Sequence, residues 1–129
     1  MTFVDTNVVM YTVGRPHPLR EPAREFFADS ALHRKPLCTS AEVLQELMHA
    51  YLAVQRESTL DMAMALIARA GIDVWPLESD DVHLAWRLRS QFPALTARDL
   101  CHLASCRRRG VTDIKTFDRA FGSAVRAVD

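Results

Sequence analysis

Four carboxylates in the sequence each follow an apolar run or a short capping motif, namely Asp5, Glu46, Asp99 and Asp118. In a parallel α/β sheet, the loops at the carboxyl ends of the strands lie at one edge, and such folds bind their ligands there. Acids gathered at that edge would repel one another unless a cation neutralised them. Mg²⁺ and Mn²⁺ prefer oxygen ligands. The pattern therefore indicates a site for a hard divalent cation.

Two of these acids also have ordinary structural explanations. Asp99 lies three residues after Thr96, so it could complete a capping box at the start of a helix. Asp118 could be a helix N-cap, or a first-turn acid that suits the helix dipole. For either residue taken alone, the structural and the functional interpretations both stay open.

The other two acids are harder to explain by local structure. Glu46 lies among the apolar residues of a helical pattern, where a lone carboxylate is unfavourable without a partner. Asp5 directly follows an apolar strand, so turn formation explains its residue type but not its burial. Glu42, one helical turn before Glu46, matches a capping box with Thr39 and is left outside the site.

Length and composition predict one domain over residues 1–129. The chain is 49% hydrophobic, which is enough to fill a single core. Sixteen basic and sixteen acidic side chains cancel, so any binding of phosphate must come from local clusters or from metal. The three cysteines lack metal-ligand spacing, which favours reduced thiols and a cytoplasmic protein. The apolar start lacks a basic segment and is interrupted by Asp5, so it predicts neither a signal peptide nor a membrane span.

Apolar periodicity predicts strands that alternate with helices. The expected strands cover residues 2–5, 36–38, 72–75, 111–115 and, weakly, 124–128. Helices are expected for a turn or two after residue 8, over 20–32, 42–52 and 59–70, from 79, over 97–109, and as a short turn at 118–121. Gly71 suits a left-handed helix cap. The alternation predicts an α/β fold with a central, mainly parallel sheet of four to five strands, covered on both faces.

Four motifs, in this order, resemble those of PIN-domain ribonucleases. They are Val4-Asp5-Thr6-Asn7-Val8; Thr39-Ser40 leading to Glu46-Leu47; Arg98-Asp99-Leu100 with His102-Leu103-Ala104; and Lys115-Thr116-Phe117-Asp118 before Phe121. The resemblance runs from Phe3 to about Gly122 and is strongest for the VapC-type toxins of bacterial toxin–antitoxin pairs. It implies a PIN-like α/β/α sandwich.

The resemblance also implies roles for individual residues. Asp5, Glu46, Asp99 and Asp118 match the metal-site acids of the family, Thr116 matches the hydroxyl residue that supports them, and Asn7 matches a position that braces the first motif. Many relatives carry a further acid two residues after the fourth, where this chain has Ala120. A second metal position is therefore expected to be loose, or filled only when substrate is bound.

The implied activity is that of a Mg²⁺- or Mn²⁺-dependent endoribonuclease that leaves a 5′-phosphate and a 3′-hydroxyl. Two divalent ions bridged by carboxylates can activate a water and stabilise the leaving 3′-oxygen without a histidine base. As a toxin, the protein would cleave tRNA or ribosomal RNA, inhibit translation and growth, and form a homodimer. A small VapB-like antitoxin is expected to bind a groove of the early helices near Phe26, Phe27, Met48 and Tyr51, and to insert a basic residue toward the acids.

Basic residues beside the acids are candidates for contacts with RNA. Arg98, Lys115 and Arg119 adjoin the motif acids in sequence and could bind phosphates. The arginine triplet at 107–109 is expected at a helix C-terminus, where positive charge is stabilising in any case. His102 is expected on a helix near the site.

Two other classes of protein stay open as alternatives. A phospho-acceptor receiver domain also has an acid after its first strand and a lysine near its last, as Asp5 and Lys115 are placed here. Such a domain needs paired acids after strand one and an acceptor after strand three, where this chain has Trp75-Pro76. The other alternative is a catalytically inert PIN-like interaction module that keeps the acids for folding. Metal-dependent cleavage of RNA separates this module from the enzyme.

Overall fold

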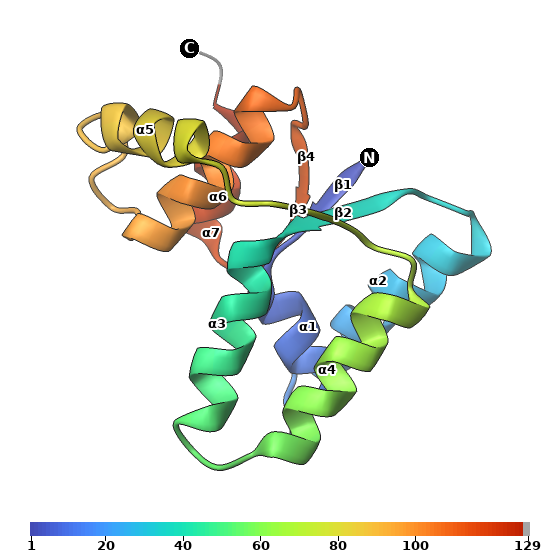
Figure 1. Cartoon of the computed structure of the whole chain (residues 1–129). Helices are drawn as coiled ribbons and strands as arrows, with labels where there is room; N and C mark the ends of the chain where they lie inside the picture. The colour runs from blue at the N-terminus through green and yellow to red at the C-terminus, as the bar shows by residue number, and fades with distance from the viewer. Residues whose placement is uncertain (128–129) are drawn as a thin grey trace.

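Strands and helices alternate along the chain, as the apolar periodicity predicts. The computed structural model describes residues 1–127. The strands are β1 (Thr2–Val4), β2 (Leu37–Ser40), β3 (Asp73–Trp75) and β4 (Asp113–Lys115). The helices are α1 (Thr6–Val13), α2 (Arg20–Leu32), α3 (Ala41–Leu52), α4 (Glu57–Arg69), α5 (Ser79–Leu88), α6 (Ala97–Arg108) and α7 (Arg119–Arg126). In Figure 1, α1 to α4 lie below the strands and α5 to α7 lie to their left.

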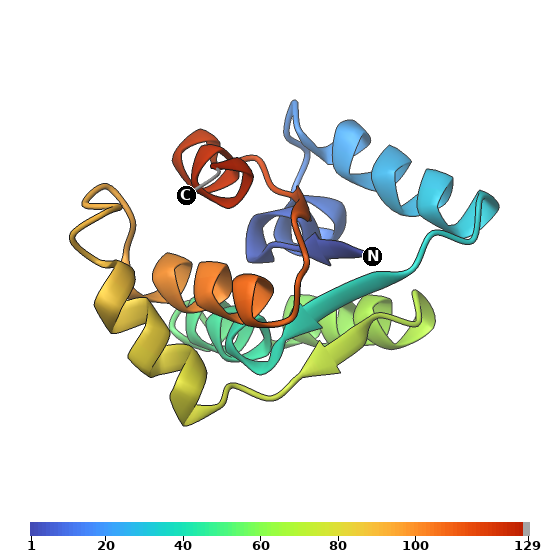
Figure 2. The same cartoon turned by 90° about the horizontal axis from the view of Figure 1, so that it is seen from above.

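The four described strands form one parallel sheet in the order β3-β2-β1-β4. Phe3 of the central strand β1 is paired with Cys38 of β2 on one side and with Ile114 of β4 on the other. Because the strands are parallel, the chain leaves β1, β2 and β4 at the same edge, and there it begins α1, α3 and α7. Figure 2 shows β1 between β4 and β2, with α2 and α5 at opposite corners of the molecule. The predicted α/β class with a parallel sheet is confirmed.

A single core fixes the ends of the elements that carry the motif acids. Phe3 of β1, Leu47 of α3, Leu103 of α6 and Phe121 of α7 are all 0% exposed. Full burial of large side chains from elements far apart in the sequence is the main source of stability in a domain of this size. The backbone that carries each acid is therefore held by its own buried neighbours.

Two glycines end helices in the left-handed region of backbone space. Gly71 follows α4 with a φ of +63°, and Gly110 follows α6 with a φ of +69°. No atom lies within 4 Å of the position that a Cβ would take at either residue. The backbone conformation, and not the lack of space, thus favours glycine there. The predicted left-handed cap at Gly71 is confirmed.

The predicted final strand over residues 124–128 is wrong for the part of it that the structure describes. The helix α7 runs Arg119–Arg126 instead, and Val128 lies outside the described residues. Oδ1 of Asp118 accepts the N–H of Phe121 at 3.1 Å and so caps this helix. The residues at 121, 124 and 125 are buried at helical spacing. An N-cap followed by that spacing favours a helix over a strand.

The predicted capping box between Thr39 and Glu42 is also wrong. Thr39 belongs to β2, and its hydroxyl donates to the carbonyl oxygen of Val4 at 2.8 Å. That bond ties β2 to β1, so the hydroxyl is not available to cap α3. The Glu42 carboxylate pairs instead with Arg98, at 3.6 Å between Oε1 and Nε. A contact between distant segments has replaced the local one.

The helix α4 begins at Glu57 and not near Thr59 as predicted. The residue at its N-cap, Arg56, makes no side-chain capping bond. Ser58 and Asp61 match the capping-box pattern in the sequence, which places the helix start near Thr59. Ser58 instead lies inside the helix, and the Thr59 hydroxyl accepts a hydrogen bond from the Arg56 guanidinium at 3.2 Å.

The described cysteines are free, and two of them are buried. Cys38 and Cys106 are 0% exposed, and burial raises the pKa of the Cys38 thiol to about 12. Both thiols therefore stay protonated near neutral pH. Separately, none of the helices described over residues 1–127 is long and apolar enough to cross a membrane.

Candidate active site

The Asp5 carboxylate lies at the end of the central strand and at the start of α1. The residue is only 5% exposed. Its Oδ1 accepts the N–H of Thr6 at 2.7 Å, which makes Asp5 the N-cap of α1. Its Oδ2 accepts the Thr116 hydroxyl at 2.7 Å and the Asn7 side-chain amide at 3.5 Å. Groups from both ends of the chain thus orient this one carboxylate.

Asn7 and Thr116 connect the first motif to the fourth. The Asn7 amide donates to Oγ1 of Thr116 at 3.3 Å, and its Oδ1 accepts the N–H of Phe117 at 3.2 Å. Oγ1 of Thr116 also accepts the N–H of Asp118 at 3.0 Å. One hydroxyl therefore binds the Asp5 carboxylate and positions the backbone that carries Asp118. The two predicted supporting residues are both in contact with the first acid.

Glu46 has a partner in His102. Its Oε1 lies 2.7 Å from Nε2 of the histidine, and Nδ1 of the same ring lies 3.4 Å from the Ser40 hydroxyl. The ring of His102 is 0% exposed, with its centroid 5.5 Å from that of Phe3 and 5.9 Å from that of Phe121. The sequence pattern places this histidine near the site but misses its pairing with Glu46. Its position one helical turn after Asp99 indicates that it lies near that acid but not which residue it contacts.

Burial and charge act on Asp5 and Glu46 in opposite directions. Burial raises the pKa of Asp5 above its ordinary value and the charge of Glu46 raises it further, while His102, Thr116 and Thr6 act to lower it. Burial also acts to raise the pKa of Glu46, but the hydrogen bond and charge of His102 outweigh it, and this pKa is lowered. The ionised form is therefore favoured for Glu46, whereas burial and the charge of Glu46 disfavour the ionised form of Asp5.

The other two predicted acids serve as helix caps. Oδ2 of Asp99 accepts the N–H of Thr96 at 3.3 Å, and the Thr96 hydroxyl accepts the N–H of Asp99 at 3.2 Å, which forms the capping box of α6. Asp118 is the N-cap of α7. The structural interpretations of both acids are confirmed. No hydrogen bond among the described residues joins Asp99 to the other three acids.

The donor set suits a hydrated hard cation, although no ready cage is formed. Over residues 1–127, no three His, Cys, Asp or Glu side chains form a group that could hold a metal ion. Mg²⁺, however, is commonly bound by one or two carboxylates together with waters and substrate phosphates. Asp5 and Glu46 fit this mode, since their charges act on each other. Asp99 and Asp118 each use one carboxylate oxygen for capping, and the other makes no hydrogen bond within the described chain.

The three candidate RNA contacts are engaged to different degrees. Arg119 is exposed at the first position of α7, and no ion pair or hydrogen bond occupies it within residues 1–127. Arg98 is paired with Glu42 at 3.6 Å. The ammonium of Lys115 lies 5.1 Å from the centroid of the Phe117 ring. Arg119 is therefore the most available of the three for a phosphate.

Two arginines of the triplet hold α5 against α6. Nη1 of Arg108 and Nη1 of Arg109 lie 2.7 and 2.9 Å from Oδ1 of Asp81, whose side chain is 0% exposed. Arg109 also pairs with Glu78 at 2.9 Å, and its guanidinium lies 4.9 Å from the centroid of Trp75. For these two arginines the expected structural role is confirmed, through ion pairs more than through the helix end.

Comparison of the sequence with known proteins gives a match along nearly the whole chain. The PIN domain family model matches residues 2–126. The chain is also 58% identical over 127 residues to Ribonuclease VapC23 of Mycobacterium tuberculosis, an alignment that covers 98% of this chain and 100% of that protein.

Solved structures give the same fold. Mycobacterium tuberculosis VapC20, a Sarcin-Ricin loop cleaving toxin, superposes with a TM-score of 0.81 at 21% identity, over 96% of this chain and 95% of that one. VapBC2 of Rickettsia felis, bound to a DNA fragment from its promoter, superposes with a TM-score of 0.69 at 16% identity, over 95% and 92%. Sequence and fold agree, and the chain belongs to the PIN domain family, in its VapC group.

Proposed function

We propose that this chain is a divalent-metal-dependent endoribonuclease of the cytoplasm and the toxin of a toxin–antitoxin pair. The observation that carries the proposal is the Asp5 carboxylate, buried at the end of β1, oriented by Thr116 and Asn7, and subject to the charge of Glu46. Such a site repels RNA phosphates unless a cation intervenes. The similarity to VapC ribonucleases supports RNA as the substrate class.

The metal ligands in this proposal are Asp5, Glu46, Asp99 and Asp118. Bound Mg²⁺ or Mn²⁺ would supply an activated water and offset the charge that develops on the phosphate. The protein's part is positioning. Thr116 and Asn7 hold the Asp5 carboxylate in one orientation, and the His102 ring holds that of Glu46. Pre-oriented carboxylates keep the ligand geometry within the narrow limits that Mg²⁺ demands.

The RNA backbone would be held by Arg119, Arg98 and Lys115. Hydrolysis breaks the bond between phosphorus and the 3′-oxygen, so the products carry a 5′-phosphate and a 3′-hydroxyl. Because tRNA and ribosomal RNA are the targets we propose, cleavage would stop translation and growth.

One assay tests the proposed activity. The purified chain should cleave RNA in Mg²⁺ or Mn²⁺ and should stop when EDTA is added. Asp5→Asn should abolish cleavage while circular dichroism and the melting temperature report an intact fold, because asparagine caps a helix as well as aspartate does. Full activity of purified Asp5→Asn would refute the assignment of the site.

A second candidate function is an inert interaction module. The capping roles of Asp99 and Asp118 favour it, because helix starts alone account for both acids. The same assay decides between the two functions. Tight binding of an antitoxin without any metal-dependent cleavage of RNA would support the module.

The proposed antitoxin would cover the exposed apolar residues of α3 and α4. Met48, Leu52 and Met62 are 46%, 44% and 49% exposed, and exposed apolar groups of this kind suit a protein partner. Tyr51 is only 3% exposed and belongs to the core, and residues 26–27 are partly buried, so of the residues predicted for the groove Met48 is the open one. Expression of the chain alone should slow growth, and co-expression with the product of the neighbouring gene should restore it.

A homodimer is part of the same proposal. Trp86 and Val82 lie on one face of α5 and are 60% and 45% exposed, and exposed tryptophans are frequent anchors of interfaces. Light scattering should give twice the chain mass for the wild type and the monomer mass for Trp86→Ala.

A further inference from the structure

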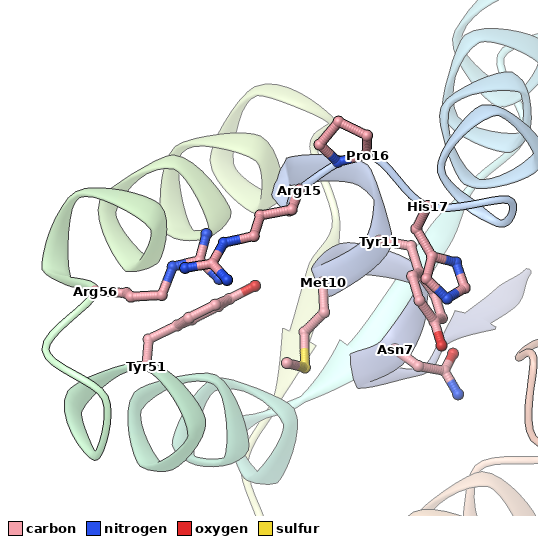
Figure 3. Close-up of a pocket in the computed structure, with 9 residues that line it drawn as sticks. Asn7, Met10, Tyr11, Arg15, Pro16, His17, Tyr51 and Arg56 are labelled. Carbon is pink, nitrogen blue, oxygen red and sulfur yellow. The ribbon is translucent and has the colours of Figure 1, made fainter.

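A cavity of about 300 Å³ opens next to the candidate active site. It lies between α1, the segment 14–17 and the end of α3 with the turn before α4 (Figure 3). Its volume is at the lower end of the range of about 300–1,000 Å³ for small-molecule sites. The cavity is thus large enough for one small, flat ligand group and too small for a folded segment.

The lining carries positive charge that nothing in the cavity balances. Arg15 and Arg56 both line it, and its lining contains no aspartate or glutamate. Arg15 is exposed and makes no hydrogen bond or ion pair within residues 1–127. The guanidinium of Arg56 donates to the Thr59 hydroxyl and lies 5.6 Å from the centroid of the Tyr51 ring, and no acidic partner for it lies within the described residues either. In a chain of zero net charge, this local excess favours an anionic ligand.

The opposite wall is aromatic. The rings of Tyr11 and His17 lie against each other, with centroids 4.6 Å apart and planes inclined by 32°. Nδ1 of His17 accepts the N–H of Leu19 at 3.0 Å, so the neutral ring carries its proton on Nε2 and can donate there. Figure 3 shows both rings on one side of Met10, with Tyr51 and the arginines on the other. Aromatic faces beside guanidinium groups are the usual surroundings of unpaired RNA bases.

The cavity is connected to the Asp5 carboxylate through residues of α1. Asn7 lines the cavity, and its side chain also donates to Asp5 and to Thr116. One helical turn further along α1, the Tyr11 ring meets the ring of Phe117, the residue after Thr116, at 5.6 Å between centroids. A group bound in the cavity is therefore separated from the Asp5 carboxylate by the Asn7 side chain, which contacts both.

We propose that this cavity binds one unpaired nucleotide of the RNA substrate, next to the phosphodiester that is cleaved. Arg15 and Arg56 hold its phosphate, and its base lies against Tyr11 and His17. The proposal rests on the ribonuclease function above and deepens it, because it names the part of the protein that selects a single-stranded nucleotide. A basic antitoxin side chain is a poor occupant, since it would meet the charge of two arginines.

Affinity for RNA tests the charged side of the cavity. In the Asp5→Asn background, anisotropy measures binding of a fluorescently labelled, random-sequence single-stranded RNA pool at several salt concentrations. Arg15→Gln should weaken binding and lower the slope of log affinity against log salt by about 0.7, as expected for one lost phosphate contact. The matched control is Arg87→Gln, an exposed arginine on α5 outside the cavity, which should leave affinity and slope unchanged.

Base removal tests the aromatic side. With the wild type, an abasic nucleotide placed at successive positions of a cleaved RNA should raise KM at one position beside the cleaved bond. His17→Ala should raise KM for the intact RNA by roughly 5- to 150-fold, the range for loss of one stacked base. The abasic position and His17→Ala should not add, because both remove the same contact.

The possible results distinguish a failure of this proposal from a failure of the proposed ribonuclease function. If the wild type cleaves RNA but Arg15→Gln and His17→Ala leave affinity and KM unchanged, the cavity is not a nucleotide site and the ribonuclease assignment stands. Weakened antitoxin binding with unchanged RNA cleavage would assign the cavity to the antitoxin and overturn the proposal. A wild type that cleaves no RNA in Mg²⁺ or Mn²⁺ would overturn both.

Discussion

Nε2 of His102 lies 2.7 Å from Oε1 of Glu46, so a fully buried ring on α6 holds a carboxylate on α3. The pair joins residues that are 56 positions apart in the chain. Through Phe3 and Phe121, the same ring also packs on β1 and α7. One side chain thus connects the elements that carry Asp5, Glu46, Asp99 and Asp118.

Replacing His102 should therefore affect stability and cleavage together. His102→Leu fills the core but leaves Glu46 without its partner, which should lower the free energy of unfolding by about 1–3 kcal/mol. It should also lower kcat for RNA cleavage more than it changes KM, because the carboxylate loses its orientation and not its contact with RNA. His102→Gln retains a donor and should recover part of kcat. Wild-type kcat in His102→Leu would contradict this positioning role.

Metal binding should stabilise the folded chain through the acids. Mg²⁺ should raise the melting temperature of the wild type, because the ion binds the folded state and relieves the repulsion between Asp5 and Glu46. At 100 times the dissociation constant the gain is about 2.7 kcal/mol. The double variant Asp5→Asn/Glu46→Gln should lose this rise in differential scanning fluorimetry. An equal rise in that variant would place the metal elsewhere.

Binding of the RNA backbone should depend on Arg119 more than on the arginine triplet at 107–109. Arg119→Gln should weaken RNA binding and reduce the salt slope by about 0.7, while the metal-induced rise in melting temperature stays the same. Arg108→Gln should lower stability with little effect on the slope, because its guanidinium is bound to Asp81. Loss of RNA binding in Arg108→Gln alone, in protein shown to be folded, would move the RNA path to the other end of α6.

Stability should fall in acid as Asp81 becomes protonated. Burial acts to raise its pKa, but hydrogen bonds from Arg109, Arg108 and the Glu78 backbone outweigh it, so the pKa lies below the ordinary value of 3.8. The stabilisation is therefore complete above about pH 4 and is lost as the pH falls through the lowered pKa. Asp81→Asn should cost about 2 kcal/mol at neutral pH in urea unfolding, and this difference from the wild type should shrink in acid. A constant difference across pH would show that charge is not involved.

Local patterns in the sequence are enough for the order of elements from β1 to β4 and for the first motif. The apolar run before Asp5 predicts β1, and Gly71 marks the end of α4, because both signals act within a few residues. The interpretation fails where a distant group competes. The Thr39 hydroxyl fits a capping box in sequence, but the carbonyl of Val4 takes it in the fold.

Local patterns also do not predict which side chains of distant elements contact each other. The bond between Glu46 and His102 and the stack of Tyr11 on His17 depend on how helices pack. Periodicity tells which face of a helix is buried, but not which residue of another helix lies opposite. The arrangement of the candidate site therefore needs the three-dimensional structure, whereas its candidate acids are visible in the sequence.

Because Asp5 and Asp118 are helix N-caps, only some substitutions at these positions should remove activity and keep the fold during evolution. Asp5 and Asp118 begin the helices α1 and α7, so alanine at either position removes both a candidate ligand and a helix start. Asparagine, serine or threonine removes the carboxylate alone. A pseudoenzyme descended from this chain, which still binds its partner but has stopped cutting RNA, should therefore carry one of these three residues at positions 5 and 118. Lineages with alanine at these positions should instead carry a less stable protein, by about 0.5–2 kcal/mol for each lost cap.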